Sequence, residues 1–526
     1  MNFNKFKKIS EAPTKPYKRR EQRTFDVADL YRGPVSEQST NRAPAAQLDE
    51  KLRQAYFWIV NNAIISPYYD IEYNTSPPLT FTFGDLKSIV TLPSDQSYSS
   101  FVLLPLLTLA VRKRCLLVGG PGRGKTASAF LMGIVAGYSL KDVRGAIQHG
   151  QPHMTITDLF GTPLPKDLGP SDTMDTIRIA WRRWLGMRVK IIDEYNRIPI
   201  RTQSALLTVM ADNYAEILGH IYECPESAWY LTVNNGAGGV AYKDIEALRD
   251  RIDVVVKAPH FTPRFLGELL SRVEMNCKPE EIVPPQIIFS EGELDELFKQ
   301  ILRVNIPYPL LRRLEFFASQ FEFCEHAAEQ FEYKTKDTVT LSGIDRNVVI
   351  AQDTGCDSVK NLGVQTCNGL SVRALMTILL FIKAMAYFRG DKEISLQDIR
   401  EILPFILHDK LTPNHDTPFF EDAKNFVFRV DRIGWVRNLF DLACAEYNRL
   451  DLDTRDPVGE IDEELKQGLD GVSEKDAKMK LVKIERILDN WQEGRNLNGH
   501  HYDDILTLKY LHHRYSNYLK WLRFAK

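Results

Sequence analysis

The segment GGPGRGKT spans Gly119 to Thr126 and follows Cys115–Val118, an apolar run typical of a buried strand. The apolar stretch Ala127–Tyr138 comes next and has helical character. A glycine-rich loop between a strand and a helix is the Walker A pattern, whose backbone N–H groups curl around phosphate oxygens. The sequence therefore predicts a nucleotide site made of Gly119, Gly120, Pro121, Gly122, Arg123, Gly124, Lys125, Thr126 and Ala127.

Two of these side chains have distinct expected roles. Lys125 supplies a positive charge to the β- and γ-phosphates, and Thr126 offers its hydroxyl to Mg²⁺. Further along, VKIIDEYNR places Asp193 and Glu194 at the end of a second buried strand. Adjacent carboxylates there are costly unless a cation or a reacting water uses them. We expect Asp193 to join Thr126 at the metal and Glu194 to polarise the attacking water; two acids merely ending a strand is the weaker alternative.

Polar residues also follow the next two strands. The run WYLTVNN ends in Asn234 and Asn235, and either amide is placed to orient the water. The run LRDRID then puts Arg249 and Arg251 just before the last core strand. A guanidinium at that point reaches a neighbouring subunit's nucleotide more easily than its own, which predicts an arginine finger acting in trans. An exposed arginine without a role is the alternative.

Hydrophobic patterning divides the chain into five parts. Residues 101–262 alternate β-rich and helical runs, which predicts a three-layer α/β core with a mostly parallel sheet. Residues 263–412 are mainly helical, with a C-cap at Gly390 and a helix start at Ser395 and Asp398. Within an insertion near 325–366, the stretch 337–353 is expected to form a β-hairpin. Residues 413–526 are again helical, and end in aromatic and basic residues.

The N-terminal residues differ from the core. Residues 1–45 lack hydrophobic periodicity and are expected to form a flexible basic arm, with eight basic and two acidic side chains among the first 25. Residues 46–100 are expected to be an ordered accessory segment, with strand-like alternation at Leu79–Phe83 and Ile89–Leu92. The pattern DQSYS, Asp95 to Ser99, fits the metal motif of von Willebrand factor A domains, but too little chain follows it before the Walker A strand.

Composition excludes several classes of protein. The 526 residues carry 67 Lys and Arg against 69 Asp and Glu, so no overall basic field indicates nucleic acid. The most apolar stretch, Phe101–Val111, is short and contains Pro105, so no membrane span is expected. Seven scattered cysteines without a Cys-x-x-Cys pair argue against disulfides or structural zinc. A cytoplasmic protein is the expectation.

Taken together, these motifs resemble those of the AAA+ ATPases and, more narrowly, of the MoxR family. The similar segments are MTITDLFGTPLP (154–165), IIDEYNRIPIRTQSALLTVMAD (191–212), LSVRAL (370–375) and FRGDKEISLQDIREILPFILHDKL (388–411). The resemblance implies an AAA+ three-layer αβα P-loop core with an all-α lid, here with mainly helical N- and C-terminal extensions. It also implies Asn234 as sensor 1, Arg251 as the finger and Arg373 as sensor 2. Asn235 replaces the family's usual proline, and Val372 replaces the proline expected before Arg373.

The family resemblance also implies a function. It suggests an ATP- and Mg²⁺-dependent ATPase, assembled as a homohexameric ring, that remodels or matures a partner protein in a chaperone-like way. The resemblance further implies that the ATPase acts together with a von Willebrand factor A domain protein, and that the remodelling includes insertion of a metal or cofactor. Two alternatives stay open: a nucleic-acid-associated AAA+ motor or regulator, and a scaffold that binds ATP without useful turnover.

Overall fold

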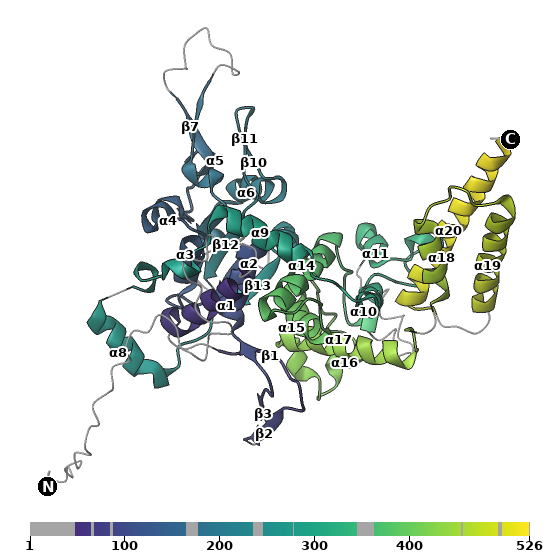
Figure 1. Ribbon diagram of the computed structural model, residues 1–526, viewed down its shortest axis with the longest axis horizontal. Coiled ribbons are helices and arrows are strands. Elements are labelled where there is room, and N and C mark those ends of the chain that lie inside the picture. The colour runs from purple at the N-terminus through teal and green to yellow at the C-terminus, as the bar shows by residue number, and fades with distance from the viewer. Residues whose placement is uncertain are drawn as a thin grey trace.

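A parallel five-stranded sheet forms the centre of the computed structural model, with strand order β13-β5-β12-β9-β6 (Figure 1). The model describes residues 48–64, 68–84, 88–164, 177–234, 246–276, 278–344, 362–453, 456–492 and 497–524. The sheet strands are β5 (Arg114–Gly119), β6 (Gln148–His149), β9 (Val189–Asp193), β12 (Ala228–Asn234) and β13 (Val254–Lys257). The four apolar runs predicted as strands are confirmed, and all four sheet pairings are parallel.

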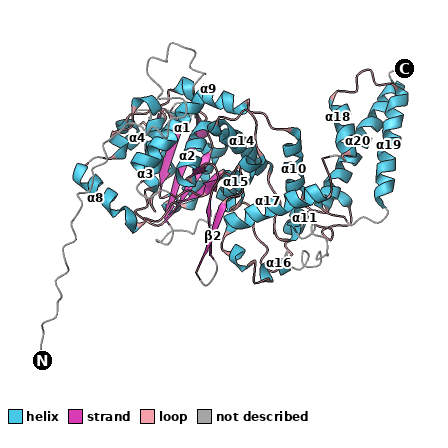
Figure 2. Ribbon diagram, turned by 60° about the horizontal axis from the view of Figure 1, so that its bottom comes forward, coloured by secondary structure: helices cyan, strands magenta, loops and turns pink. Residues whose placement is uncertain are grey.

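Alternating side chains of the strands enter two different cores. Cys115 and Leu117 lie in a core shared with α2 (Ser100–Val111) and α3 (Lys125–Val135). Leu116, on the opposite face of the sheet, packs with residues from α5 (Ile156–Phe160) and α6 (Ile200–Asp212). Because side chains alternate along a strand, both faces of this sheet are buried. Figure 2 shows the strands enclosed by helices, so the predicted three-layer α/β core is confirmed.

Helix α2 explains the most apolar stretch of the sequence. Every residue of α2 is buried, including Pro105, because the helix lies between the sheet and the helices α1 (Leu48–Trp58) and α14 (Val372–Arg389). The Tyr230 hydroxyl donates a hydrogen bond to the Pro105 carbonyl at 2.8 Å. Over the described residues, we find no helix with the length and apolarity that a bilayer crossing requires.

The remaining elements of the core surround this sheet. Two hairpins, β7 with β8 and β10 with β11, project together on one side of the core (Figure 1). The bounds are α4 (Leu140–Ala146), α5 (Ile156–Phe160), β7 (Gly161–Pro163), β8 (Ile179–Trp181), α6 (Ile200–Asp212), β10 (Tyr214–Ile217), β11 (His220–Glu223), α7 (Glu246–Arg251) and α8 (Leu266–Met275).

The N-terminal segment combines one helix with two short antiparallel pairs. Helix α1 (Leu48–Trp58) packs on α2 and α14, and β1 (Ile71–Glu72) pairs with β4 (Ser97–Tyr98). The predicted alternating runs form the hairpin of β2 (Leu79–Phe83) and β3 (Ser88–Leu92). Five large apolar side chains share one face of this hairpin and are exposed to solvent; they are Leu79, Phe81, Phe83, Val90 and Leu92.

The predicted helix signals after the core are confirmed. Helix α14 (Val372–Arg389) starts where the Ser371 side chain accepts a hydrogen bond from Ala374 N, and it ends at Gly390 in the left-handed region, φ 84°. Helix α15 (Leu396–Leu407) begins with a capping box of Ser395 and Asp398. The elements between them and the core are α9 (Glu291–Leu302), α10 (Tyr308–Ser319) and α11 (Lys336–Ser342).

The expectation of a β-hairpin over 337–353 is wrong for its first part. Residues 336–342 form α11, and residues 345–361 lie outside the described residues. The Thr335 hydroxyl accepts from Thr338 N at 3.2 Å and caps the helix, while Val339 is buried beside Cys324. An N-cap and one buried contact outweigh the β-propensity of the Thr-Val-Thr run.

The C-terminal residues are helical, as predicted. Helix α17 (Arg432–Arg449) follows α16 (Pro418–Glu421) and packs on α15. The last three helices, α18 (Pro457–Lys466), α19 (Glu474–Gln492) and α20 (Gly499–Phe524), enclose a separate core and form what we call the C-terminal three-helix unit. In Figure 1 this unit projects away from the sheet, at the yellow end of the chain.

Candidate functional site

The glycine-rich loop joins β5 to α3 and takes a backbone path that needs glycine. Gly122 and Gly124 have φ values of 70° and 75°, in the left-handed region that favours glycine. A side chain at Gly119 would meet the Cβ of Ala258 at 3.1 Å. The loop ends at Lys125, the first residue of α3, so the N–H groups of a helix N-terminus face the predicted phosphate position.

Lys125 is held inside this loop by three acceptors. Its ammonium donates to the carbonyls of Gly119 and Gly120 at 2.8 and 2.7 Å and to Oδ1 of Asn234 at 2.8 Å. The side chain is only 5% exposed. Burial lowers the pKa of Lys125, and the nearby carboxylate of Asp193 opposes that effect. The positive charge is therefore fixed at the mouth of the loop.

The two residues predicted for Mg²⁺ lie in contact. The Thr126 hydroxyl donates to Asp193 Oδ1 at 2.7 Å, and the Thr232 hydroxyl donates to the same oxygen at 2.7 Å. A hydroxyl and a carboxylate side by side fit Mg²⁺, which usually takes few protein ligands besides phosphate and water oxygens. Accordingly, no group of three or more His, Cys, Asp and Glu side chains suited to a metal occurs within the described ranges.

Glu194 occupies a constrained position after β9. Its backbone is left-handed, with φ 54° and ψ 47°, and its N–H donates to the Thr232 hydroxyl at 3.0 Å. Its Oε1 accepts from Asn234 Nδ2 at 2.8 Å, and its Oε2 pairs with Arg197 at 3.0 Å. Left-handed backbone is uncommon for a residue other than glycine and is concentrated at functional sites.

Asn234 links Lys125, predicted to bind phosphate, to Glu194, predicted to activate water. It accepts from Lys125 with its oxygen and donates to Glu194 with its nitrogen. The structure thus brings Lys125, Thr126, Asp193, Glu194 and Asn234 together at the carboxyl edge of the sheet. Asn235, the other amide considered for this role, lies outside the described residues.

The predicted arginines form a second group, around α7. Arg373 pairs with Asp250 at 2.6 Å, and the Ser371 hydroxyl donates to the same carboxylate at 2.9 Å. Arg249 donates through Nε to the Asp409 carbonyl at 3.1 Å. The structure therefore groups Arg373 with the finger candidates and not with Lys125.

Arg251 ends α7 and lies near Tyr195, the residue after Glu194. Burial raises the pKa of the Tyr195 hydroxyl, and the positive charge of Arg251 acts in the opposite direction. Of the two finger candidates, Arg249 is engaged with the backbone that follows α15, and Arg251 lies toward the end of β9.

Three residues at the site were not predicted from the sequence. Thr232 lies two positions before Asn234 and therefore on the same face of β12, so strand periodicity was a usable signal. His149 ends the two-residue strand β6, with Nδ1 3.2 Å from Asp193 Oδ2. Arg197 lies on a single 3₁₀ turn after Glu194. Elements as short as these two carry no periodic sequence signal.

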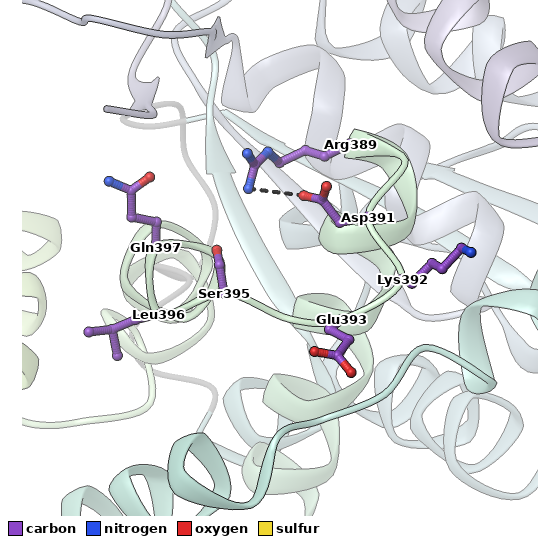
Figure 3. Close-up of a pocket in the computed structure, with 7 residues that line it drawn as sticks. All are labelled: Arg389, Asp391, Lys392, Glu393, Ser395, Leu396 and Gln397. Atoms are coloured by element: carbon purple, nitrogen blue, oxygen red, sulfur yellow. Dashed lines mark ion pairs between the residues drawn. The ribbon is translucent and has the colours of Figure 1, made fainter. Parts of the chain in front are cut away.

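A second concave region lies at the turn between α14 and α15 (Figure 3). Arg389 points toward Asp391 there, at 3.3 Å, and also pairs with the buried Asp398 at 3.2 Å. The Tyr73 hydroxyl donates to that same Asp398 carboxylate at 2.8 Å, and the Arg389 guanidinium lies 4.1 Å from the centre of the Tyr73 ring. The Gln397 amide donates to the Asn74 carbonyl at 2.7 Å, so these groups anchor the N-terminal segment to α15.

Comparison with known proteins gives three findings. Residues 364–428 match the family model of the AAA lid domain. The chain is 26% identical to the Chaperone MoxR1 of Mycobacterium tuberculosis over 317 aligned residues. This alignment covers 59% of this chain and 71% of that protein. The chain is also similar to a crystal structure from Cytophaga hutchinsonii, described as a candidate ATPase, with TM-score 0.45, 19% identity, and coverage of 63% of this chain and 88% of that chain.

Proposed function

We propose that this chain, a MoxR-family AAA+ ATPase by its motifs, its lid domain and its relative, hydrolyses ATP and uses that reaction to remodel a partner protein. One observation carries the proposal: Lys125, Asn234 and Glu194 form a continuous hydrogen-bonded chain beside the contact of Thr126 with Asp193. This arrangement joins phosphate binding, metal binding and water activation within one edge of the sheet.

Each residue then has a defined task. Lys125 exchanges its carbonyl and amide acceptors for oxygens of the β- and γ-phosphates. Thr126 and Asp193 would hold Mg²⁺, which supplies positive charge to the phosphate oxygens when bound. Glu194 orients a water molecule and accepts its proton as the water oxygen attacks the γ-phosphorus and the bond to the β-phosphate oxygen breaks. Asn234 holds the Glu194 carboxylate in place until the nucleotide competes for Lys125.

The second arginine group supports assembly into a ring. Arg251 lies at the end of α7. An arginine supplied to a neighbour's nucleotide requires repeated head-to-tail contacts. A closed homohexamer satisfies that requirement. In this proposal Arg249 fixes α7 to the lid through Asp409, and Arg251 acts as the finger. Arg373 pairs with Asp250 of α7 and so responds to movement of α7 at the same subunit boundary.

Hydrolysis at this site is tested by replacing Glu194. The variant Glu194→Gln should bind ATP with near-normal affinity yet release phosphate about 10²–10⁴ times more slowly, because the carboxylate base is lost. The variant Glu460→Gln removes an exposed carboxylate on α18 and serves as the matched control. Unchanged phosphate release by Glu194→Gln would instead favour a scaffold that binds nucleotide without turnover.

Assembly is tested by mixing subunits. Arg251→Ala should bind ATP and lose about 10³-fold in turnover. Rings that contain both Arg251→Ala and wild-type subunits should then show less ATPase activity than the fraction of wild-type subunits in the mixture would give. Strictly proportional activity would contradict a finger in trans, and it would leave the hydrolysis proposal intact.

The partner is proposed from the family and is open to direct capture. A Glu194→Gln chain with ATP should hold its partner in a pull-down from native lysate, with a von Willebrand factor A domain protein or a metalloenzyme as the expected catch. A nuclease-treated sample is the control. A complex lost on nuclease treatment would replace remodelling by the nucleic-acid alternative.

A further inference from the structure

The outward face of α20 carries aromatic and basic side chains in an uninterrupted row. We call Tyr510, His513, Arg514, Asn517 and Trp521 the aromatic–basic stripe. All five side chains are exposed, with Tyr510 at 52% and Trp521 at 60%. Between residues 505 and 522 the sequence contains no Asp or Glu, so no carboxylate of this part of α20 lies within the stripe.

Helical spacing places the stripe opposite a buried face. Positions 510, 514, 517 and 521 follow the i, i+4, i+7, i+11 pattern of one helix face. The other side of α20 contributes Leu508, Leu511, Tyr515 and Leu519 to the core of the C-terminal three-helix unit. The helix is therefore anchored by one face, and the five stripe residues lie outside that core.

The stripe side chains are arranged in advance. The Arg514 guanidinium lies over the Tyr510 ring at 5.9 Å, and the Trp521 ring stacks on Tyr518 with centroids 5.9 Å apart and planes 23° apart. Such contacts restrict the rotamers of these side chains before anything binds, which lowers the entropic cost of binding. Trp, Tyr and Arg are also the residue types that dominate binding energy in protein interfaces.

We propose that the aromatic–basic stripe is a docking surface for an acidic amphipathic helix of a partner protein. Carboxylates about 9 Å apart along that helix would match the six-residue spacing of Arg514 and Lys520, both exposed, while its apolar side chains cover Tyr510 and Trp521. Eleven residues of α20 separate the two aromatic side chains, about 16 Å, which sets the length of the docked helix at about three turns. The docking surface rests on the proposed remodelling function, to which it adds only the chemistry of the partner.

Charge density favours a protein over a nucleic acid here. Duplex DNA carries one charge per about 1.7 Å of axis, and binding it depends on many phosphate contacts. The stripe itself holds one permanent positive charge, Arg514, with Lys520 beside it, and the nearby Lys509 is already paired with Glu332. The chain as a whole carries a formal charge of −2, which adds no long-range attraction for a polyanion.

The test uses the full chain and two designed peptides of about 18 residues. One carries Leu on one face and Glu on the other, and the second has Lys in place of every Glu. Binding is followed by the fluorescence anisotropy of the labelled peptides, with labelled oligo-dT as a third probe. The wild-type chain should bind the Leu/Glu peptide in a salt-sensitive way and should not bind the Leu/Lys peptide.

Three variants localise the binding. Arg514→Glu and Trp521→Ala should each lower the affinity of the chain for the Leu/Glu peptide by about tenfold or more. Lys475→Glu, an exposed charge reversal on α19, should bind as the wild type does. All three should retain ATPase activity, so a failure of docking is distinguishable from a failure of hydrolysis. Equal binding by every variant, no binding by the wild type, or preferential binding of oligo-dT would each overturn the proposal.

Discussion

The carboxyl edge of the sheet and the C-terminal three-helix unit handle their polar groups in opposite ways. At the sheet edge, Lys125, Asn234 and Glu194 hold one another through hydrogen bonds inside the chain. On α20, Arg514 and Trp521 face solvent on a helix whose other side is fully packed. Groups that perform chemistry must be positioned before the substrate arrives, whereas groups that recognise a partner must remain uncovered.

The same contrast extends to the cores. The two large cores share the sheet, since Cys115 and Leu116 are adjacent in β5 and enter different ones. The three-helix unit has its own core and joins the body chiefly near α10, where Phe316 contacts His500. Damage to the sheet should therefore reach the nucleotide site, whereas damage within the unit should remain local.

The largest expected effect is the loss of ATP affinity when Lys125 is replaced. Lys125→Ala removes the fixed ammonium, and losing one partner of a buried charged contact costs about 2–5 kcal/mol. Affinity for ATP should fall by roughly a hundredfold or more, with turnover lost at ordinary ATP concentrations. Nucleotide binding by calorimetry checks this. Near-normal affinity would show that the sheet edge is not the phosphate site.

The next effect compares two buried leucines. Leu511→Ala in the three-helix unit and Leu231→Ala in β12 each remove a fully buried side chain, at about 2–4 kcal/mol. We expect Leu511→Ala to shift an early unfolding transition and leave ATPase activity unchanged, and Leu231→Ala to lower both stability and activity. Thermal unfolding with parallel ATPase assays distinguishes them. A single shared transition would contradict the independence of the unit.

A smaller effect is expected at Thr232. Thr232→Val keeps the shape of the side chain but leaves Asp193 and the Glu194 N–H without its hydroxyl, at a cost of about 1–3 kcal/mol. Turnover should fall by about tenfold, because Glu194 loses the contact that holds its left-handed backbone. Thr232→Ser should restore most of the activity. If serine and valine behave alike, the hydroxyl has no positioning role.

The smallest effect concerns pH and lies in α20. Burial raises the pKa of Asp504 from its usual 3.8 to about 7, and His500 Nε2 lies 3.3 Å from its carboxylate. The folded chain thus retains a proton that the unfolded chain releases, so the free energy of unfolding falls as pH rises from about 4 to 7. Asp504→Asn should stabilise the unit more at pH 8 than at pH 4, because the neutral amide carries no charge that burial penalises. Equal shifts at both values would contradict a protonation effect.

Much of the sheet edge was predictable because its signals are local. A glycine loop, two acids ending a strand and an amide ending the next strand lie at the same edge once the strands are parallel. Thr232 was also predictable, because it lies two positions before Asn234 and therefore on the same face of β12. His149 and Arg197 lie on elements of two and three residues, whose placement depends on the sheet and not on their own sequence.

The regions outside the core were less predictable for a physical reason. The helix signals at Gly390 and Ser395 are chemical caps, and both were correct. The stretch after Thr335 has strand-forming residues, but a cap and the burial of Val339 made it helical. Tertiary contacts of this kind override local propensity. The domain boundaries themselves stay predictions.

The β2–β3 hairpin has a consequence for the behaviour of many chains in solution. Its apolar face pairs Phe81 with Val90 across the strands. Among the described residues, no third strand pairs with either outer edge of this ribbon. Ribbons of this kind can recruit strands from other molecules and seed aggregates. Pro77, Pro78 and Pro93 flank the two strands and cannot donate to a growing ladder. The prolines thus act as gatekeepers against aggregation at the base of the ribbon.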